Sequence, residues 1–277
     1  MPGRLLCLLL GVVLLTSVTG CSSDSAGDSE EPAPRVEMSF SQHRIDEGSD
    51  RANLRVVNDS DRPAQVTEIG LDSAGYGEHV EDHDSLVQPG QTIDLRMTLP
   101  EPVCDASPTP AYGIVTIAGT RIREKLDTFG QDFVESLWRR TCNLLSVTTV
   151  ADLAWRFDYE AVGTGRASYL RGVLGVTRKP GATTPLRVVG MQGSVLFRLQ
   201  QTARPTLGPD DEQASVPLRL RWGRCDEHAI SESSQTFLWK LDISVDGKEP
   251  VRITTTVDES DRAPLLDYLK KACGLTS

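Results

Sequence analysis

The chain has 277 residues, a formal net charge of −10, and 39% hydrophobic residues. That length is enough for more than one domain of ordinary size. Charge is uneven, because residues 36–150 hold 19 acids and 10 bases (net −9) whereas residues 151–277 hold 16 acids and 17 bases (net +1). Neither half has the basic excess of a nucleic-acid-binding protein, and the acidic half argues against close contact with an anionic membrane surface.

The amino-terminal segment predicts export. A short basic stretch, residues 1–4, precedes an apolar run over residues 5–15, which is shorter than the roughly 20 residues that span a bilayer. Residues 1–20 therefore read as a signal peptide. The following Val18-Thr19-Gly20-Cys21 resembles the lipobox of bacterial lipoproteins. That resemblance implies a lipidated Cys21 that holds the protein on the extracytoplasmic face of the cell membrane, since two acyl chains anchor stably. Ordinary secretory cleavage beside an incidental cysteine is the alternative.

Residues 21–35 have the composition of a flexible tether. The stretch "SSDSAGDSEEPAP" after Cys21 contains no large apolar side chain and cannot bury enough surface to offset the entropy of ordering. An acidic binding tail is the alternative interpretation. Across the whole chain Arg outnumbers Lys 23 to 6, a bias that suggests a high-GC genome and an actinobacterial source.

Most of the remaining chain predicts strands. Apolar and polar residues alternate with a period of two, which indicates half-buried strands with one solvated face. The clearest of these segments are residues 36–40, 52–56, 93–99, 153–159, 216–222 and 237–245. Turn sequences separate the strands: "NDSDRP" at 58–63, "QPGQ" at 88–91, "RKPG" at 178–181 and "GPDD" at 208–211.

Two stretches of the chain resemble each other in order of features. They are "LWRRTCN" (137–143) and "YLKKACG" (268–274). Each comes at the end of the same series of features: a Cys-Asp pair, an apolar strand, a turn containing Gly and a returning strand. The Cys-Asp pairs are Cys104-Asp105 and Cys225-Asp226. We interpret this order as a tandem duplication of one module, with chance similarity as the alternative.

Each repeated stretch predicts the end of a helix. The two bases fall in the last turn, where the helix dipole favours cations, and Asn143 and Gly274 tolerate the left-handed position that follows. In the second copy Asp261 is the expected N-cap, and Pro264 the expected first-turn proline. A binding patch is the alternative for the doubled phrase.

Four cysteines remain after Cys21, and an even number in an exported chain argues for two disulfides. The repeat favours pairing Cys104 with Cys142 and Cys225 with Cys273, one of three possible connectivities. Loops of 38 and 48 residues would each stabilise the fold by about 4 kcal/mol in the chain-entropy model.

These elements predict a mainly β protein of two tandem modules, 36–143 and 144–277, each a β-sandwich that ends in a short helix tied down by a disulfide. Runs such as "LRVVNDSDRPAQVTEI" (54–69) resemble the immunoglobulin-like sandwich. The cysteine pattern departs from antibody domains, whose disulfide crosses between the sheets, whereas these cysteines bracket the last two strands and the helix.

Candidate sites are few. In "EHVEDHD" (78–84) His79 and His83 would share one face of a helix and could bind a transition metal, but Gly75 and Gly77 precede them and a solvated acidic loop is the favoured interpretation. "RCDEH" (224–228) contains Cys, Asp and His, yet catalytic triads assemble from distant segments and Cys225 is an expected disulfide partner.

One strand carries a row of basic residues. Arg219 and Arg221 project from the face of "LRLRWGR" (218–224) opposite Leu218 and Leu220, with Arg224 nearby. Such a row could bind an anionic polymer, and an ordinary exposed strand face is the favoured alternative.

We therefore expect a lipid-anchored, non-enzymatic protein that binds or spaces something in the bacterial envelope. Its partners would be the membrane, through Cys21, and an unknown envelope protein or polymer, with no nucleic acid, no cofactor and no catalytic residue. A metal-dependent extracytoplasmic enzyme and a substrate-binding lipoprotein of a transporter are the alternatives.

Overall fold

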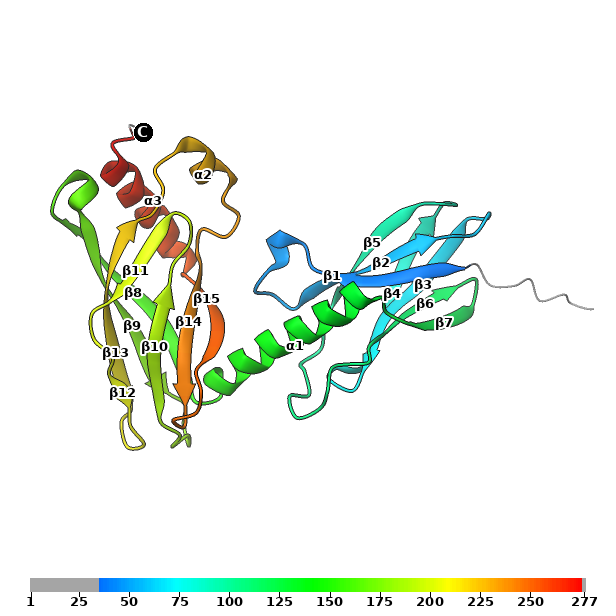
Figure 1. Cartoon of the computed structure of the whole chain (residues 1–277), viewed down its shortest axis with the longest axis horizontal. Helices are drawn as coiled ribbons and strands as arrows, with labels where there is room; N and C mark the ends of the chain where they lie inside the picture. Colours follow the sequence, from blue (N-terminus) through cyan, green and yellow to red (C-terminus); the bar gives the residue numbers. More distant parts are fainter. Residues whose placement is uncertain (1–34, 276–277) are drawn as a thin grey trace, which may run out of the picture. The chain divides into compact units, whose positions relative to one another are not determined.

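A computed structural model describes residues 35–275. The predicted signal peptide (1–20), Cys21 and all but the last residue of the predicted tether (21–35) lie outside these residues. The described chain is mainly β, and its antiparallel sheets form two β-sandwiches, each followed by a helix (Figure 1). No helix of the described chain is both long enough and apolar enough to cross a membrane.

The N-terminal sandwich packs a three-stranded sheet, β1-β2-β5, against a four-stranded sheet, β4-β3-β6-β7. Inward residues of both sheets, such as Phe40, Leu54 and Ile69, are fully buried in one hydrophobic cluster. The strands are β1 (Val36–Ser41), β2 (Arg51–Asn58), β3 (Ala64–Ser73), β4 (Gly77–Val87), β5 (Thr92–Thr98), β6 (Tyr112–Ile117) and β7 (Thr120–Lys125). A 3-10 turn, Arg44–Asp46, precedes β2.

This strand order is immunoglobulin-like with one change. In constant-type immunoglobulin domains the first, second, fifth and fourth strands share a sheet. Here the fourth strand, β4, lies instead at the edge of the opposite sheet, beside β3. The predicted sandwich class is therefore confirmed, and the disulfide does not cross between the sheets as it does in antibody domains.

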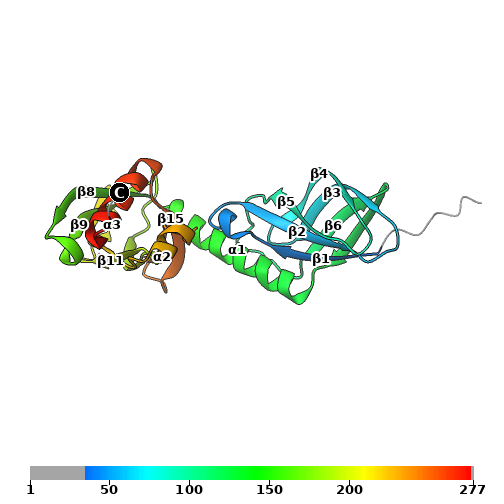
Figure 2. The ribbon, with the colours of Figure 1, turned by 90° about the horizontal axis from the view of Figure 1, so that it is seen from above.

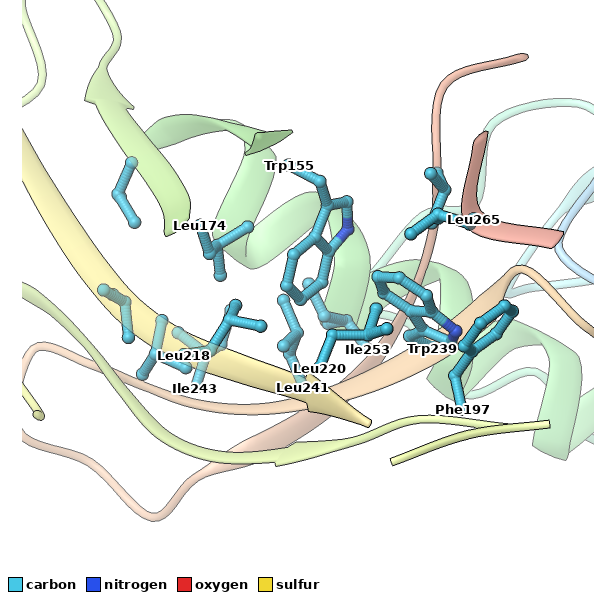
Figure 3. Close-up of a cluster of buried hydrophobic side chains, with 14 of the residues drawn as sticks. Trp155, Leu174, Phe197, Leu218, Leu220, Trp239, Leu241, Ile243, Ile253 and Leu265 are labelled. Carbon is cyan, nitrogen blue, oxygen red and sulfur yellow. The ribbon is translucent and has the colours of Figure 1, made fainter. Parts of the chain in front are cut away.

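The C-terminal sandwich packs two four-stranded sheets, β11-β13-β9-β8 and β12-β10-β14-β15. Trp239 lies at the centre of its core, fully buried, with its ring 5.0 Å from that of Trp155 in an edge-to-face arrangement (Figure 3). Such aromatic pairs add about 0.5–1.5 kcal/mol beyond area burial. The strands are β8 (Ala151–Val162), β9 (Tyr169–Arg178), β10 (Leu186–Gln192), β11 (Phe197–Gln201), β12 (Thr206–Leu207), β13 (Gln213–Trp222), β14 (Leu238–Val245) and β15 (Val251–Thr256).

The two sandwiches share one pairing scheme. The order β8-β9-β13 repeats β1-β2-β5, and the order β12-β10-β14-β15 repeats β4-β3-β6-β7, so β11 is the additional strand. The last hairpins also match: Ala118-Gly119 and Asp246-Gly247 all have positive φ, as a type I′ turn requires. This agreement supports the duplication that the order of sequence features predicted.

Helix α1 (Thr128–Thr148) corrects one prediction. It continues past Cys142 and Asn143, so "LWRRTCN" is not a helix end, and the boundary predicted at 143/144 falls inside the helix. The extension buries Val147 in the C-terminal core, whereas Val134 and Leu137 lie in the N-terminal core. The helix continues past Asn143 because residues that follow it become buried when they are helical. It can be followed as one uninterrupted ribbon in Figure 2.

Helix α3 (Glu259–Cys273) ends as predicted and begins earlier than predicted. Gly274 has φ 70° and ψ 25°, the left-handed conformation that terminates a helix. The N-cap is Asp258 rather than Asp261, which lies in the first turn. Pro264 consequently lies beyond the first turn, inside the helix. The inward face of α3 closes the C-terminal core with Leu265 and Leu269, both fully buried.

The two disulfides are the predicted pairs. Cys104 bonds Cys142, and Cys225 bonds Cys273, with Cα atoms 5.5 and 5.4 Å apart. Each joins the loop before the last hairpin of a sandwich to the helix that follows that hairpin. A short helix, α2 (Glu227–Glu232), lies directly after Cys225.

Candidate functional site

Strand β13 presents alternate residues to the core and to solvent. Leu218 and Leu220 are buried in the C-terminal core, whereas Arg219 and Arg221 are exposed on the outer face. This follows directly from the period-two alternation of a half-buried strand. The sequence prediction for these two arginines is therefore confirmed as to which face they occupy.

The sheet register brings arginines of neighbouring strands to the same place. Arg198 of β11 lies directly opposite Arg221, and Arg171 of β9 lies directly opposite Arg219. A fifth arginine, Arg156 of β8, lies opposite Val173, which is two positions along β9 from Arg171. All five are exposed. We call this set the arginine face: Arg156, Arg171, Arg198, Arg219 and Arg221. Its four strands are labelled in Figure 1.

The arginine face has no ion-pair partner in the described part of the chain. None of its five guanidinium groups forms an ion pair or a hydrogen bond with another residue in 35–275. Asp158 of β8 lies in register with Arg171, but its Oδ1 accepts a hydrogen bond from the Glu160 N–H. Like charges placed directly opposite each other destabilise a sheet. Two such pairs in a chain of net charge −10 are therefore unusual.

Tyr169 supports two of these arginines. The Arg219 and Arg221 guanidinium carbons lie 4.9 and 5.7 Å from the centre of its ring. Cation–π contacts of this kind are worth about 0.5–1 kcal/mol at exposed sites. Both guanidinium groups lie close to one ring and donate no hydrogen bond within residues 35–275, so their N–H donors are available to an anion.

The end of β13 packs against α3. Burial raises the pKa of the Tyr268 phenol, an effect that the nearby Arg221 partly opposes. The Tyr268 hydroxyl donates a hydrogen bond to the Ser168 carbonyl oxygen, just before β9 begins. The disulfide-tethered helix therefore holds the strands that carry the arginine face in place.

Arg224 does not belong to the arginine face. It lies past the end of β13, where its Nε donates a 2.8 Å hydrogen bond to Asp226. Asp226 in turn caps α2 by accepting a hydrogen bond from the Ala229 N–H, and this bond together with Arg224 holds the pKa of Asp226 below its ordinary value. Arg224, a weak candidate for an anion site, therefore lies off the arginine face with its charge paired to Asp226.

The residues of "RCDEH" do not converge on a catalytic site. Cys225 is held in a disulfide, Asp226 caps a helix, and the side chain of His228 is 89% exposed beside Glu232. A nucleophile needs a free thiolate and a base within hydrogen-bonding distance. Neither condition is met in this segment.

His79 and His83 lie on an edge strand, β4, rather than in the expected loop. His79 Nε2 lies 3.2 Å from Glu81 Oε1, and His83 Nδ1 lies 3.1 Å from Ser85 Oγ. Glu81 Oε1 also accepts a hydrogen bond from the Thr98 N–H at the end of β5. In residues 35–275 no three His, Cys, Asp or Glu side chains are grouped so as to hold a metal ion.

Sequence reasoning found only part of the arginine face. The alternation in "YLRGVLGV" (169–176) places Arg171 outward, and Arg198 precedes an apolar residue in a short strand. Local sequence pattern does not give the strand order. Strand β11 pairs with β13, although β12 lies between them in the chain and belongs to the other sheet. A like-charge pair can be recognised only after that order is known.

No protein-family model and no curated protein matches this chain. Among solved structures it is similar to red sea bream transglutaminase, with a TM-score of 0.25, 16% identity, 82% of this chain covered and 31% of that one. An exo-chitosanase from Amycolatopsis orientalis, CsxA, gives a TM-score of 0.20, 13% identity, and 79% and 26% coverage. The BSP domain of a biofilm associated protein gives a TM-score of 0.22, 8% identity, and 88% and 62% coverage.

The chain spans less than a third of the length of the first two of these proteins. Similarities at these TM-scores carry no argument about activity, ligand or partner. The function must therefore be argued from the residues of this chain.

Proposed function

We propose that the protein is a lipid-anchored, non-enzymatic binding protein of the bacterial envelope, and that the arginine face contacts an anionic partner. The observation that carries this proposal is the absence of any ion pair for the five arginines within residues 35–275. Opposed like charges destabilise the sheet, and Asp158, in register with Arg171, and the Tyr169 ring, beside Arg219 and Arg221, offset them only in part. A ligand that supplies the negative charge accounts for the arrangement.

The anchor part of the proposal rests on Cys21 and on the two disulfides. Disulfides persist in oxidising, extracytoplasmic compartments, which agrees with an exported protein, and the lipobox-like sequence before Cys21 supplies the attachment point. Mass spectrometry of the N-terminal peptide from membrane fractions should show a diacylglyceryl group on Cys21. Cys21→Ser should release the protein from the membrane or leave its signal peptide uncleaved. An unmodified Cys21 in a membrane-bound protein would overturn the anchor.

A binding role is supported by where the reactive side chains lie. All four cysteines of the described chain are in disulfides, and of its four histidines only His79 and His83 share a segment, the edge strand β4. The antiparallel sheets also differ from the two lobes of alternating strands and helices that substrate-binding proteins of transporters usually have. We therefore favour recognition by an exposed sheet face.

The binding test uses the full chain, purified in detergent, and isolated cell-wall material. The variant Arg171→Gln/Arg198→Gln/Arg219→Gln/Arg221→Gln removes four charges of the arginine face. The matched control, Arg55→Gln/Arg123→Gln/Arg139→Gln/Arg252→Gln, removes four arginines that already form ion pairs. Both variants change net charge equally.

We expect the arginine-face variant to lose co-sedimentation with cell walls and the matched control to keep it. Binding of the wild type should also weaken as salt rises, because the contacts are exposed ion pairs. Equal co-sedimentation of the two variants would overturn the proposed binding surface.

A further inference from the structure

The outer surface of the sheet β11-β13-β9-β8 has two chemically different halves. One half is the arginine face. The other half, toward the opposite ends of β8, β9 and β13, carries small or uncharged side chains at its centre. At its far end lies Asp152 of β8, whose carboxylate is paired with Lys179 Nζ at 2.6 Å. The central residues of this half are Ala154, Gly175 and Ser215, which lie side by side in the register. We call these three residues the neutral half.

The geometry of the arginine face suits an extended ligand. Neighbouring residues lie about 4.8 Å apart across a sheet and about 6.7 Å apart along one face of a strand, so the charges form a regular array on an exposed surface. A small molecule is usually bound in a cavity that surrounds it. Exposed ion pairs are individually weak, and their effect becomes large only when one ligand engages several at once.

The guanidinium groups favour anions that accept two parallel hydrogen bonds, as carboxylates and phosphates do. Every charge of the arginine face is an arginine, whose fork of N–H donors binds a carboxylate with two parallel hydrogen bonds. Arg219 and Arg221 both lie against the Tyr169 ring, and their N–H donors have no hydrogen-bond partner within residues 35–275. A lysine row would offer point charges without this directionality.

Single-stranded nucleic acid is a poorer match for this surface. Proteins that bind it use free aromatic faces on which bases stack. Here Tyr169 is covered by two arginines, and the Trp222 ring faces the Arg166 guanidinium at 5.6 Å while its Nε1–H donates to the Arg166 carbonyl oxygen. These two aromatic rings are therefore already occupied.

The neutral half distinguishes among polyanions. A polymer charged at every backbone position, such as polyphosphate, gains nothing from a flat uncharged surface beside the arginines. A polysaccharide with carboxylates has both charged groups and uncharged ring faces. We infer that the arginine face and the neutral half together bind a linear, carboxylate-bearing polysaccharide. This inference rests on the proposed binding function and names its ligand class.

The test measures binding of the full chain in detergent to four labelled polymers. They are polygalacturonate, neutral dextran, polyphosphate and single-stranded DNA. We expect polygalacturonate to bind at least about tenfold more tightly than polyphosphate or DNA, with a marked salt dependence. Dextran should show no measurable binding. Equal affinity for all three polyanions would overturn the polysaccharide assignment.

Two sets of variants locate the contact. The four-fold Gln variant of the arginine face should weaken polygalacturonate binding by at least about tenfold, and the matched control Arg55→Gln/Arg123→Gln/Arg139→Gln/Arg252→Gln should stay within about twofold. Ala154→Gln/Ser215→Gln places longer uncharged side chains on the neutral half. It should weaken binding of polygalacturonate severalfold and leave any residual binding of polyphosphate unchanged. No effect on polygalacturonate would exclude the neutral half from the contact.

The two proposals fail separately. Arginine-dependent co-sedimentation with cell walls, together with no preference for polygalacturonate, would overturn the polysaccharide inference and leave the binding surface standing. If the four-fold variant kept both cell-wall binding and polygalacturonate binding, both proposals would be overturned. Circular-dichroism spectra and unfolding curves of each variant establish that its fold is intact.

Discussion

Arg198 and Arg221 lie directly opposite each other across β11 and β13, and neither forms an ion pair within the part of the chain that the structure describes. An opposed pair of like charges destabilises a sheet by an amount similar to the gain from a favourable cross-strand pair, about 0.2–1 kcal/mol. Arg198→Gln should therefore raise the free energy of unfolding by a few tenths of a kcal/mol while weakening ligand binding. The gain should shrink at high salt, which screens exposed charges.

Urea unfolding followed by tryptophan fluorescence measures this effect. Three of the four tryptophans, Trp155, Trp222 and Trp239, lie in the C-terminal sandwich, so the signal reports mainly on that module. Arg187→Gln is the control, because Arg187 of β10 lies opposite Ser244 and Thr206 rather than another arginine. A lower midpoint for Arg198→Gln would contradict the repulsion.

The disulfide Cys225–Cys273 should stabilise one sandwich alone. It closes a loop of 48 residues, and removing a native disulfide of this kind typically costs about 2–5 kcal/mol. Since the two hydrophobic clusters have separate residues, Cys225→Ser/Cys273→Ser should increase hydrogen exchange in α3, β14 and β15. Exchange in β1, β2 and β5 should stay unchanged.

The reciprocal variant, Cys104→Ser/Cys142→Ser, provides the comparison. It should increase exchange in β6, β7 and the N-terminal half of α1, with little change in the C-terminal sheets. Hydrogen exchange read by mass spectrometry resolves these segments. If either variant loosened both sandwiches equally, the modules would not be energetically independent.

Local pattern was enough to predict most of the strands and the sandwich class, and the repeat was enough to predict the disulfide pairs. Val36, Met38 and Phe40 alternate with polar residues, and they are all buried in β1. Gly274 stops α3 because a residue without a Cβ adopts positive φ at little cost. These features depend on a few neighbouring residues, so the sequence alone contains them.

The errors arose where burial by distant residues decided the outcome. Asn143 could have ended α1, but Val147 gains a fully buried position by continuing the helix into the second core. "EHVEDHD" has no apolar alternation, yet it forms a strand because β3 offers a partner for its backbone. The arginine face likewise depends on strand order, which local pattern does not encode.

The inward-pointing pair His79 and Glu81 should protect the edge of β4. These residues lie opposite Leu71 and Ile69, both fully buried, so they occupy the inner side of the sheet at its open edge. Inward charges are a known way to keep an edge strand from pairing with another chain. His79→Val/Glu81→Val should therefore produce concentration-dependent association in sedimentation velocity.

Valines on a central strand supply the control for that edge. Thr177→Val/Lys240→Val adds two valines to exposed positions of β9 and β14, each of which is paired with a neighbouring strand on both sides. That variant should remain as monodisperse as the wild type. Association of the control to the same extent would show that added hydrophobicity, rather than the open edge, is responsible.

The buried phenol of Tyr76 should make the protein sensitive to alkali. Burial raises the pKa of Tyr76 to about 12, with Thr141 and Arg140 acting in the opposite direction. In the unfolded chain the phenol titrates near 10. Below that pH both states keep the proton and the group adds no pH dependence. Above it the unfolded chain releases the proton first, so the free energy of unfolding falls as pH rises toward the folded pKa.

This group alone should contribute a slope of about 1.4 kcal/mol per pH unit in that window. Tyr159 and Tyr268 also have raised pKa values, so the wild type should lose stability more steeply than one group predicts. Tyr76→Phe removes one of the three contributions. Urea unfolding of wild type and variant should give parallel curves up to about pH 9 and a shallower decline for the variant from about pH 10 to about pH 12. The same decline in both proteins would mean that Tyr76 ionises in the folded state as readily as in the unfolded chain, which its burial among the core residues of the N-terminal sandwich should prevent.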